Sequence, residues 1–186
     1  PADFVARQMR VVLSDIGADC VKTGMLHRAD IIDAVCEVLE AEDGAIPLVV
    51  DPVMVAKGGA SLITEAAVAR LKERMFPLAT VLTPNLPEAE ALSGLRLSDA
   101  GDAAAVAGAL AALGPKVVLV KGGHMEGDKV TDMVFEGGKE VARFESERLD
   151  TTNTHGTGCT MASAIATGIA QGLAIVDAVA RAHRYV

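Results

Sequence analysis

The sequence predicts an α/β fold in which helices cover both faces of a mostly parallel sheet. Four short runs rich in Val, Leu and Ile alternate with amphipathic helical patterns, which is typical of parallel strands joined by crossover helices. Hydrophobic residues make up 51% of the chain and aromatic residues only 3%, so aliphatic side chains have to build the core. Gly137-Gly138 separates two further strand patterns, which predicts an antiparallel hairpin at the edge of the sheet.

Hydrophobic periodicity and capping signals place the individual elements in order along the chain. Apolar residues recur at helical spacing from residue 4 to 16, and residues 19–24 are interpreted as a short first strand. Thr64 is a helix cap, and the helix that it opens is expected to end near Phe76 because Pro77 follows. The remaining helices are predicted at 29–42, 87–92 and 99–113, and two more begin at about 157 and 176. The remaining strands are predicted at 46–50, 79–83, 116–120, 130–135 and 140–144.

Composition and charge exclude several classes of protein. The formal net charge is −8 and no basic stripe with interleaved aromatic residues is present, so nucleic acid is not an expected partner. No apolar run reaches the length of a membrane span and no signal peptide is visible, which favours a cytoplasmic protein. Cys20, Cys36 and Cys159 are too widely spaced for a zinc site. We expect one domain over residues 1–186 and a small-molecule substrate.

The segment 151–160 contains two glycines directly ahead of an apolar helical run. Gly156 and Gly158 let the backbone bend where a side chain would block it. The helix that follows leaves its first amide groups unpaired, and its dipole makes that end positive. Such a turn is a cradle for a phosphate or another oxyanion, so Gly156, Thr157 and Gly158 are candidate site residues. Cys159 lies beside this cradle, where the pKa of a thiol is expected to fall.

Cys159 allows three interpretations. A buried cysteine at a helix start is inert, which is the usual fate of this residue type. Alternatively, Cys159 is a nucleophile with His155 as its base, which would make the protein a cysteine hydrolase. In the third interpretation the thiol orients or deprotonates a substrate hydroxyl, and His155 fixes the loop by a hydrogen bond. His183 in the last helix is interpreted as a surface or packing histidine.

Polar or glycine-containing clusters follow each of the four parallel strand patterns. Because the carboxyl ends of parallel strands share one edge of a sheet, these clusters should form one rim, where α/β proteins bind ligands. Asp51 is either a residue of a magnesium site or the first residue of an Asp-Pro turn. Lys121 either neutralises phosphate charge or is a solvated lysine at a strand end. The clusters are Lys22-Thr-Gly24, Asp51-Pro52, Thr83-Pro-Asn85 and Lys121-Gly-Gly123.

Asn85 and Glu88 stand three residues apart at a predicted helix start. An amide and a carboxylate there can hold hydrated Mg²⁺, which binds proteins through few side chains plus waters and phosphates. The same spacing is also that of a capping box, in which the two residues only close the helix end. The two interpretations are compatible.

Four motifs resemble those of the hydroxymethylpyrimidine/phosphomethylpyrimidine kinases of thiamine biosynthesis, which belong to the ribokinase-like superfamily. The similarity runs from about Phe4 to Val186, and four motifs in the right order are far more specific than one glycine pattern. The motifs cover residues 21–26, 50–57, 82–89 and 153–160.

This resemblance implies a ribokinase-like kinase that uses ATP and Mg²⁺. Its acceptors would be 4-amino-5-hydroxymethyl-2-methylpyrimidine and then the monophosphate of that compound. The last helix, around residues 180–186, would border the adenine, and a homodimer is expected. The implied roles are an anion hole at Gly156, Thr157, Gly158 and Cys159, nucleotide contacts at Asp51, Lys121, Thr154, His155 and Asn85, pyrimidine contact at Met25, and Mg²⁺ binding at Asn85 and Glu88.

The sequence also departs from the pattern of this family. Members usually begin with a Gly-Ser-Asp segment rich in glycine, followed by a lid, and neither is present here, so the chain is expected to be incomplete at its N-terminus. Thr23 replaces a commonly aliphatic residue, which should alter only local packing. Two alternatives stay open: a pyridoxal or pyridoxine kinase, whose family shares the cysteine version of the turn, and a non-catalytic nucleotide-binding fragment.

Overall fold

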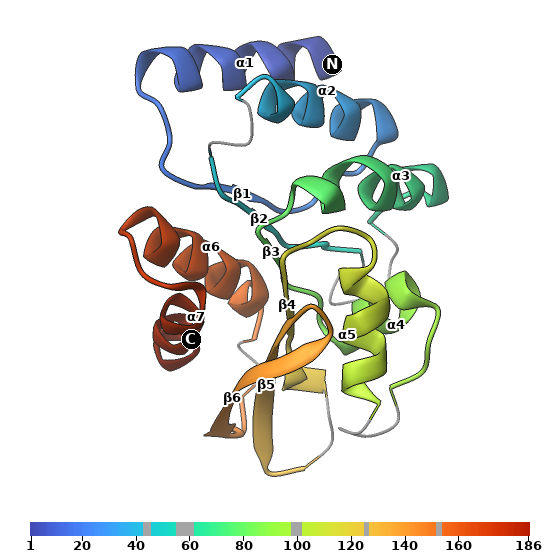
Figure 1. Ribbon diagram of the computed structural model, residues 1–186, viewed down its shortest axis with the longest axis vertical. Coiled ribbons are helices and arrows are strands. Elements are labelled where there is room, and N and C mark those ends of the chain that lie inside the picture. Colours follow the sequence, from blue (N-terminus) through green and yellow to red (C-terminus); the bar gives the residue numbers. More distant parts are fainter. Residues whose placement is uncertain (43–45, 55–61, 98–101, 125–126, 152–153) are drawn as a thin grey trace.

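A six-stranded sheet organises the part of the chain that the computed structural model describes, which comprises residues 1–42, 46–54, 62–97, 102–124, 127–151 and 154–186. Its strands lie in sequence order from β1 to β6 (Figure 1). The first four are parallel and the last two antiparallel, as the sequence predicts. The strands are β1 (Val21–Thr23), β2 (Leu48–Val50), β3 (Val81–Leu82), β4 (Val117–Val120), β5 (Lys129–Glu136) and β6 (Lys139–Glu147).

The central strands are apolar throughout because both of their faces are covered. Alternate residues point to opposite faces, so Val50 and Leu82 join one hydrophobic cluster. Their neighbours Val49 and Val81 join the other cluster. The sheet therefore separates two cores, both built from aliphatic side chains as the low aromatic content requires.

Of the α-helices in the described part of the chain, five cover one face and two cover the other (Figure 1). Right-handed crossovers between strands that follow one another in order place every connecting helix on the same face. The opposite face is covered by the two helices that follow the hairpin. The first group is α1 (Ala2–Asp15), α2 (Ala29–Glu40), α3 (Glu65–Arg70), α4 (Leu86–Ser93) and α5 (Ala103–Ala111), and the second is α6 (Thr157–Ala170) and α7 (Ile175–Tyr185).

Two predicted elements differ in detail from the structure. Thr64 caps α3 as expected, because its side chain accepts a hydrogen bond from the amide of Ala67. After Arg70, however, the helix widens into a π-helical turn at Leu71–Met75 and tightens into a 3₁₀ turn at Phe76–Leu78. Pro77 lies inside this last turn, where its missing amide is tolerated, instead of beyond the helix. The strand predicted at 79–83 is only two residues long. Residues 99–101 of the helix predicted at 99–113 lie outside the described part.

The hairpin turn between β5 and β6 is confirmed. Gly137 has a φ of 54° and Gly138 a φ of 78°, and both values lie in the left-handed region that a two-residue hairpin turn requires. A Cβ at Gly138 would also lie 3.1 Å from the Cα of Gly108 in α5, so glycine lets the turn pack against that helix. The hairpin therefore forms the antiparallel edge that the sequence predicts.

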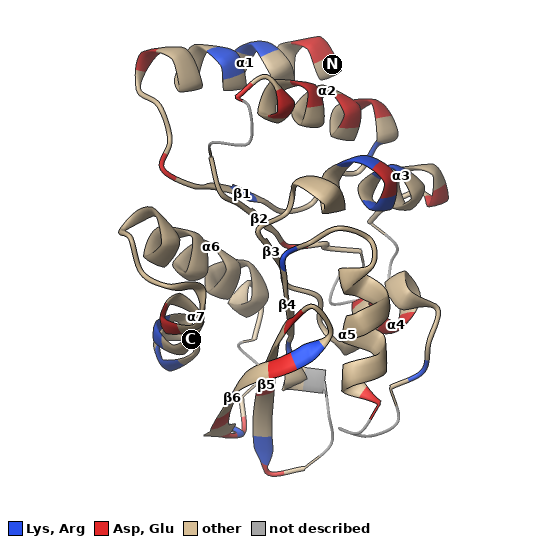
Figure 2. Ribbon diagram, viewed as in Figure 1, with Lys and Arg blue, Asp and Glu red and all other residues tan. Residues whose placement is uncertain are grey.

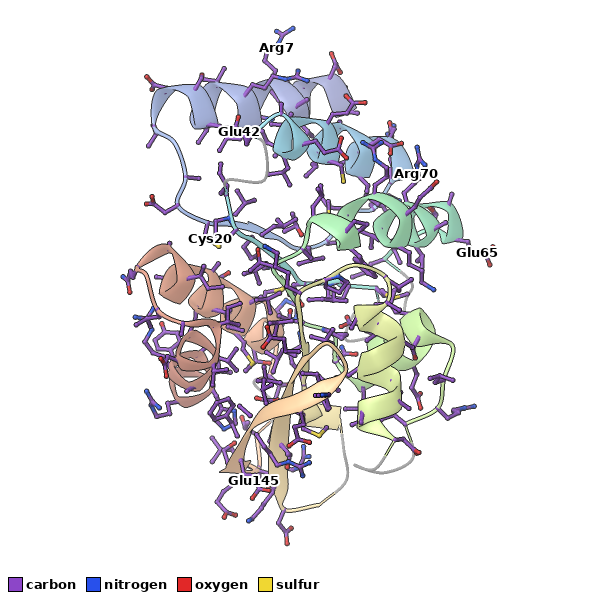
Figure 3. The ribbon with its side chains drawn as sticks, in the orientation of Figure 1. Arg7, Cys20, Glu42, Glu65, Arg70 and Glu145 are labelled. Carbon is purple, nitrogen blue, oxygen red and sulfur yellow. The ribbon has the colours of Figure 1, made fainter. Side chains whose placement is uncertain are left out.

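Charged side chains lie on α1, α2, α3, α4, α7 and the hairpin, whereas α5 and α6 carry none (Figure 2). Arg70 of α3 faces the end of α2 (Figure 3), where its Nε lies 3.0 Å from Asp33 Oδ1. Arg74 contacts the same carboxylate at 3.3 Å, so these pairs fasten α2 to the segment after α3.

Within the described ranges, no helix is both long and apolar enough to cross a bilayer.

Candidate active site

The carboxyl ends of the parallel strands form one polar rim, as the sequence predicts. Asp51, Thr83 and Lys121 directly follow β2, β3 and β4. Backbone bonds continue the alignment beyond the strands, since the amide of Asp51 donates to the carbonyl of Thr23 at 3.0 Å. The amide of Lys121 donates to the carbonyl of Pro84 at 2.9 Å. The strand ends are therefore held in register.

Asp51 is the centre of this rim, with only 2% of its surface exposed. Its Oδ1 accepts a hydrogen bond from Lys121 Nζ at 3.0 Å and a longer one from Thr83 Oγ1 at 3.4 Å. Its Oδ2 has no hydrogen-bond partner in the described structure. Asp51 is thus more than the start of a turn, and Lys121, which is 9% exposed, is not a solvated lysine.

Lys22 is a second cation at the same carboxylate, and it is absent from the candidate residues that sequence reasoning selected. Its Nζ lies 3.7 Å from Asp51 Oδ2, and its side chain is 19% exposed. The sequence feature that could have identified Lys22 is its position in one of the four strand-end clusters. Because neighbouring parallel strands bring positions 22 and 51 close together, this lysine and Asp51 had to be near one another once the register was known.

The turn before α6 has the properties of an anion cradle. Gly156 is the N-cap residue with a φ of 81°, a conformation that favours glycine. Thr157 Oγ1 donates to the carbonyl of Thr154 at 3.0 Å, which tightens the turn. Among the described residues no side-chain cap bond closes α6, and its first turn carries no acid, so these residues leave its positive end unneutralised. His155 is exposed at this turn, and Asn153 lies outside the described residues.

Lys121 joins this cradle to the rim. A Cβ built on Gly158 would lie 3.2 Å from Lys121 Nζ, so the ammonium group lies directly against the turn. Glycine at position 158 therefore leaves room for the close approach of a cation to the helix start. Backbone amides and one ammonium group together suit a phosphate.

The thiol of Cys159 differs from its predicted state. Partial burial of the sulfur and then the negative charge of Asp51 raise its pKa above the ordinary value of 9.0. The expected fall in pKa is wrong because these two effects outweigh the charges of Lys22 and Lys121, which lower the pKa. Cys159 also keeps contact with solvent, so the inert, buried interpretation does not hold. A raised pKa is the opposite of what a cysteine hydrolase requires.

Asn85 and Glu88 form both bonds of a capping box. The amide of Glu88 donates to Asn85 Oδ1 at 2.9 Å, and the amide of Asn85 donates to Glu88 Oε2 at 2.8 Å. Glu88 Oε1 also accepts a longer bond of 3.4 Å from the amide of Met54. Burial raises the pKa of Glu88, which Lys121 partly offsets. The capping interpretation is confirmed, and the described residues hold no cluster of three or more metal-ligating side chains.

His183 is a packing residue and not a surface residue, since its ring lies 5.9 Å from that of Phe144, and it also contacts a carboxylate that the sequence does not predict. Its Nδ1 lies 2.7 Å from Asp132 Oδ2, and both side chains are almost fully buried. Asp132 Oδ1 accepts a hydrogen bond of 3.0 Å from the amide of Gly122. This chain of contacts links α7 to the residue that follows Lys121.

Two features border the rim. Met25 follows β1 and is 52% exposed, so its side chain is available to a ligand. An open groove of ≈ 590 Å³ begins at Cys159 and runs between α6 and α7. Its lining residues include Ser163, Thr167, Arg181 and Tyr185.

Comparisons with known proteins identify the family. The sequence profile of phosphomethylpyrimidine kinase matches residues 1–186. The chain belongs to the phosphomethylpyrimidine kinase family. It is 52% identical over its whole length to the thiamine biosynthesis bifunctional protein ThiED of Geobacter sulfurreducens, of which it covers 38%. It is 45% identical to the hydroxymethylpyrimidine/phosphomethylpyrimidine kinase of Streptomyces coelicolor, of which it covers 68%.

A solved structure confirms the fold. The ADP complex of Bacillus subtilis pyridoxal kinase matches with a TM-score of 0.90 and 33% identity, over all of this chain and 69% of that chain. Two predictions from the motifs are therefore confirmed. The chain has a ribokinase-like fold, and it belongs to a family of thiamine-biosynthesis kinases. Like its relatives, the chain is a member of a phosphotransferase family.

Proposed function

We propose that this chain transfers the terminal phosphoryl group of ATP to 4-amino-5-hydroxymethyl-2-methylpyrimidine and then to its monophosphate. The arrangement of Lys121 between Gly158 and Asp51 carries the proposal, because it places a buried ammonium group against an uncapped helix start. Phosphoryl transfer needs positioning and charge stabilisation more than covalent chemistry, and this arrangement supplies both.

Each residue of the rim has a role in this proposal. The amides of Gly156 to Cys159 hold the transferred phosphoryl group, and Lys121 neutralises its charge. Asn85 and Glu88 would hold Mg²⁺ through water, since their own atoms already close the start of α4. When bound, the metal would neutralise further charge on the nucleotide.

The acceptor binds on the other side of Asp51, with Met25 against its ring. Cys159 stays a thiol at neutral pH because its pKa is raised, so it orients the acceptor hydroxyl instead of removing its proton. Oδ2 of Asp51 has no hydrogen-bond partner in the described structure and is available to accept a hydrogen bond from that hydroxyl. A strong base is unnecessary if the transition state is loose.

Steady-state kinetics with separate acceptors test the proposal. We expect ADP release that depends on the pyrimidine, with the monophosphate and then the diphosphate as products. A tenfold or greater preference for pyridoxal, about 1.4 kcal/mol in transition-state binding, would favour the pyridoxal kinase that the Bacillus subtilis structure suggests. If the chain binds the nucleotide but forms no phosphorylated product, the result would support the alternative of a non-catalytic nucleotide-binding fragment. A homodimer, which light scattering would detect, remains our expectation.

A further inference from the structure

Among the residues that the structure describes, two ammonium groups face a single buried carboxylate at the rim. Lys121 Nζ lies at hydrogen-bond distance, 3.0 Å from Asp51 Oδ1, whereas Lys22 Nζ lies 3.7 Å from Oδ2. One carboxylate offsets the charge of one lysine, so these three side chains together carry one excess positive charge. The nearby carboxylate of Glu88 accepts hydrogen bonds from two backbone amides, and its charge acts on Lys121. Lys22, whose Nζ lies beyond hydrogen-bond distance from Asp51, is therefore the lysine that is available to an anionic ligand.

The two lysines lie against different walls of the site. Lys121 Nζ lies against Gly158 in the phosphate cradle. Lys22 Nζ lies instead against Gly24, 3.1 Å from the position that a Cβ there would take. Gly24 leads directly into Met25, which is exposed. Lys22 thus belongs to the wall that we assign to the acceptor, and glycine at position 24 leaves room around its ammonium group.

The two proposed acceptors differ in charge. The hydroxymethyl compound carries no phosphate, whereas a phosphate monoester carries about −1.5 to −2 charges at pH 7. The second transfer therefore brings two anionic groups together, and their repulsion has to be offset by a cation that the first transfer does not need.

We infer that Lys22 binds the phosphate of the phosphorylated acceptor and is specific to the second transfer; this inference rests on the proposed function. In that step an oxygen of the acceptor phosphate attacks the γ-phosphorus of ATP. A new P–O bond forms, the bond between the γ-phosphorus and the bridging oxygen breaks, and ADP leaves with the electron pair. Lys22 contacts the oxygens that do not react, so it takes part in no covalent change.

The test compares kcat/KM for the two acceptors at saturating ATP. We expect Lys22→Met to lower kcat/KM for the monophosphate about 100-fold, which corresponds to about 2.7 kcal/mol, and to lower it for the alcohol less than about threefold. Lys22→Arg, which keeps the charge, should recover most of the loss. Lys129→Met is the matched control, because it removes an exposed lysine that pairs with Glu145 on the hairpin.

The outcomes separate this inference from the proposed function. If the unaltered chain phosphorylates neither pyrimidine, the proposed function fails. If it phosphorylates both and Lys22→Met loses the two activities equally, or Lys22→Arg recovers nothing, only the role of Lys22 is wrong. Should Lys22→Met not fold, salt dependence replaces it: kcat/KM of the unaltered chain should fall more steeply with ionic strength for the monophosphate. Equal slopes for the two acceptors would overturn the inference.

Discussion

Replacing Gly122 by alanine should damage both stability and activity. The new Cβ would lie 1.9 Å from the carbonyl oxygen of Thr131 and 2.7 Å from its carbon, and both are backbone atoms of β5. Real Cβ atoms essentially never come closer than 3.0 Å, so the turn and the strand have to separate by about 1.1 Å. β5 cannot yield easily, because it is paired on both sides.

Two costs add in this variant. Overpacking of this kind costs about 1–3 kcal/mol. Separation also stretches the 3.0 Å hydrogen bond from the Gly122 amide to the buried Asp132, and a bond to a charged group contributes about 1.5–3 kcal/mol. Alanine recovers about 0.4–1 kcal/mol by restricting the unfolded chain. We therefore expect a net loss of about 3 kcal/mol and a fall in Tm of about 10 °C.

Thermal unfolding followed by circular dichroism, together with kcat/KM, measures this prediction. The control is Gly123→Ala, since Gly123 is exposed and its Cβ would meet no atom within 4 Å. Activity should fall with Gly122→Ala even below its Tm, because the strain acts on the residue next to Lys121. If both variants unfold within about 0.5 kcal/mol of each other, the steric reasoning is refuted.

The remaining predictions concern three side chains of the rim. Cys159→Ala should lower kcat more than nucleotide affinity, and equal losses, measured by kinetics and calorimetry, would contradict a role in transfer. Iodoacetamide should modify Cys159 slowly at pH 7 because the pKa of this thiol is raised. Asp51→Asn should speed the modification, because the charge of Asp51 helps to raise that pKa. An unchanged rate of modification in Asp51→Asn would count against the effect of this charge. The pKa of Glu88 in the folded chain lies above the ordinary 4.5, so the folded chain binds the carboxyl proton more tightly than the unfolded chain does. The stability that this proton contributes is therefore lost as pH rises through the folded-state pKa. Urea titrations should show less of this loss in Glu88→Gln, whose amide preserves the cap, and the same variant should respond less to Mg²⁺ in rate assays.

Local patterns explain what the sequence predicts correctly. The hairpin follows from two adjacent glycines, the start of α3 from one threonine, and the start of α4 from a spacing of three residues. Each depends on neighbours in the chain, so no knowledge of the fold is needed. The shared rim also follows, because parallel strands have to end at one edge.

Contacts between distant positions could not be predicted from local sequence patterns. His183 and Asp132 are 51 residues apart, and only the packing of α7 against the hairpin brings them together. The raised pKa of Cys159 depends on how deeply its sulfur is buried and on the distance to Asp51, which motifs do not encode. The π-helical turn after α3 likewise depends on tertiary packing, with Leu71 and Met75 buried in the core.

The walls of the rim come from opposite ends of the chain, since Gly24 follows the first strand and Gly158 opens the penultimate helix. Mutations that reshape one wall leave the other untouched in sequence. If the two walls bind the acceptor and the nucleotide as proposed, substitutions after the first strand would change the acceptor and leave the turn before α6 unaltered.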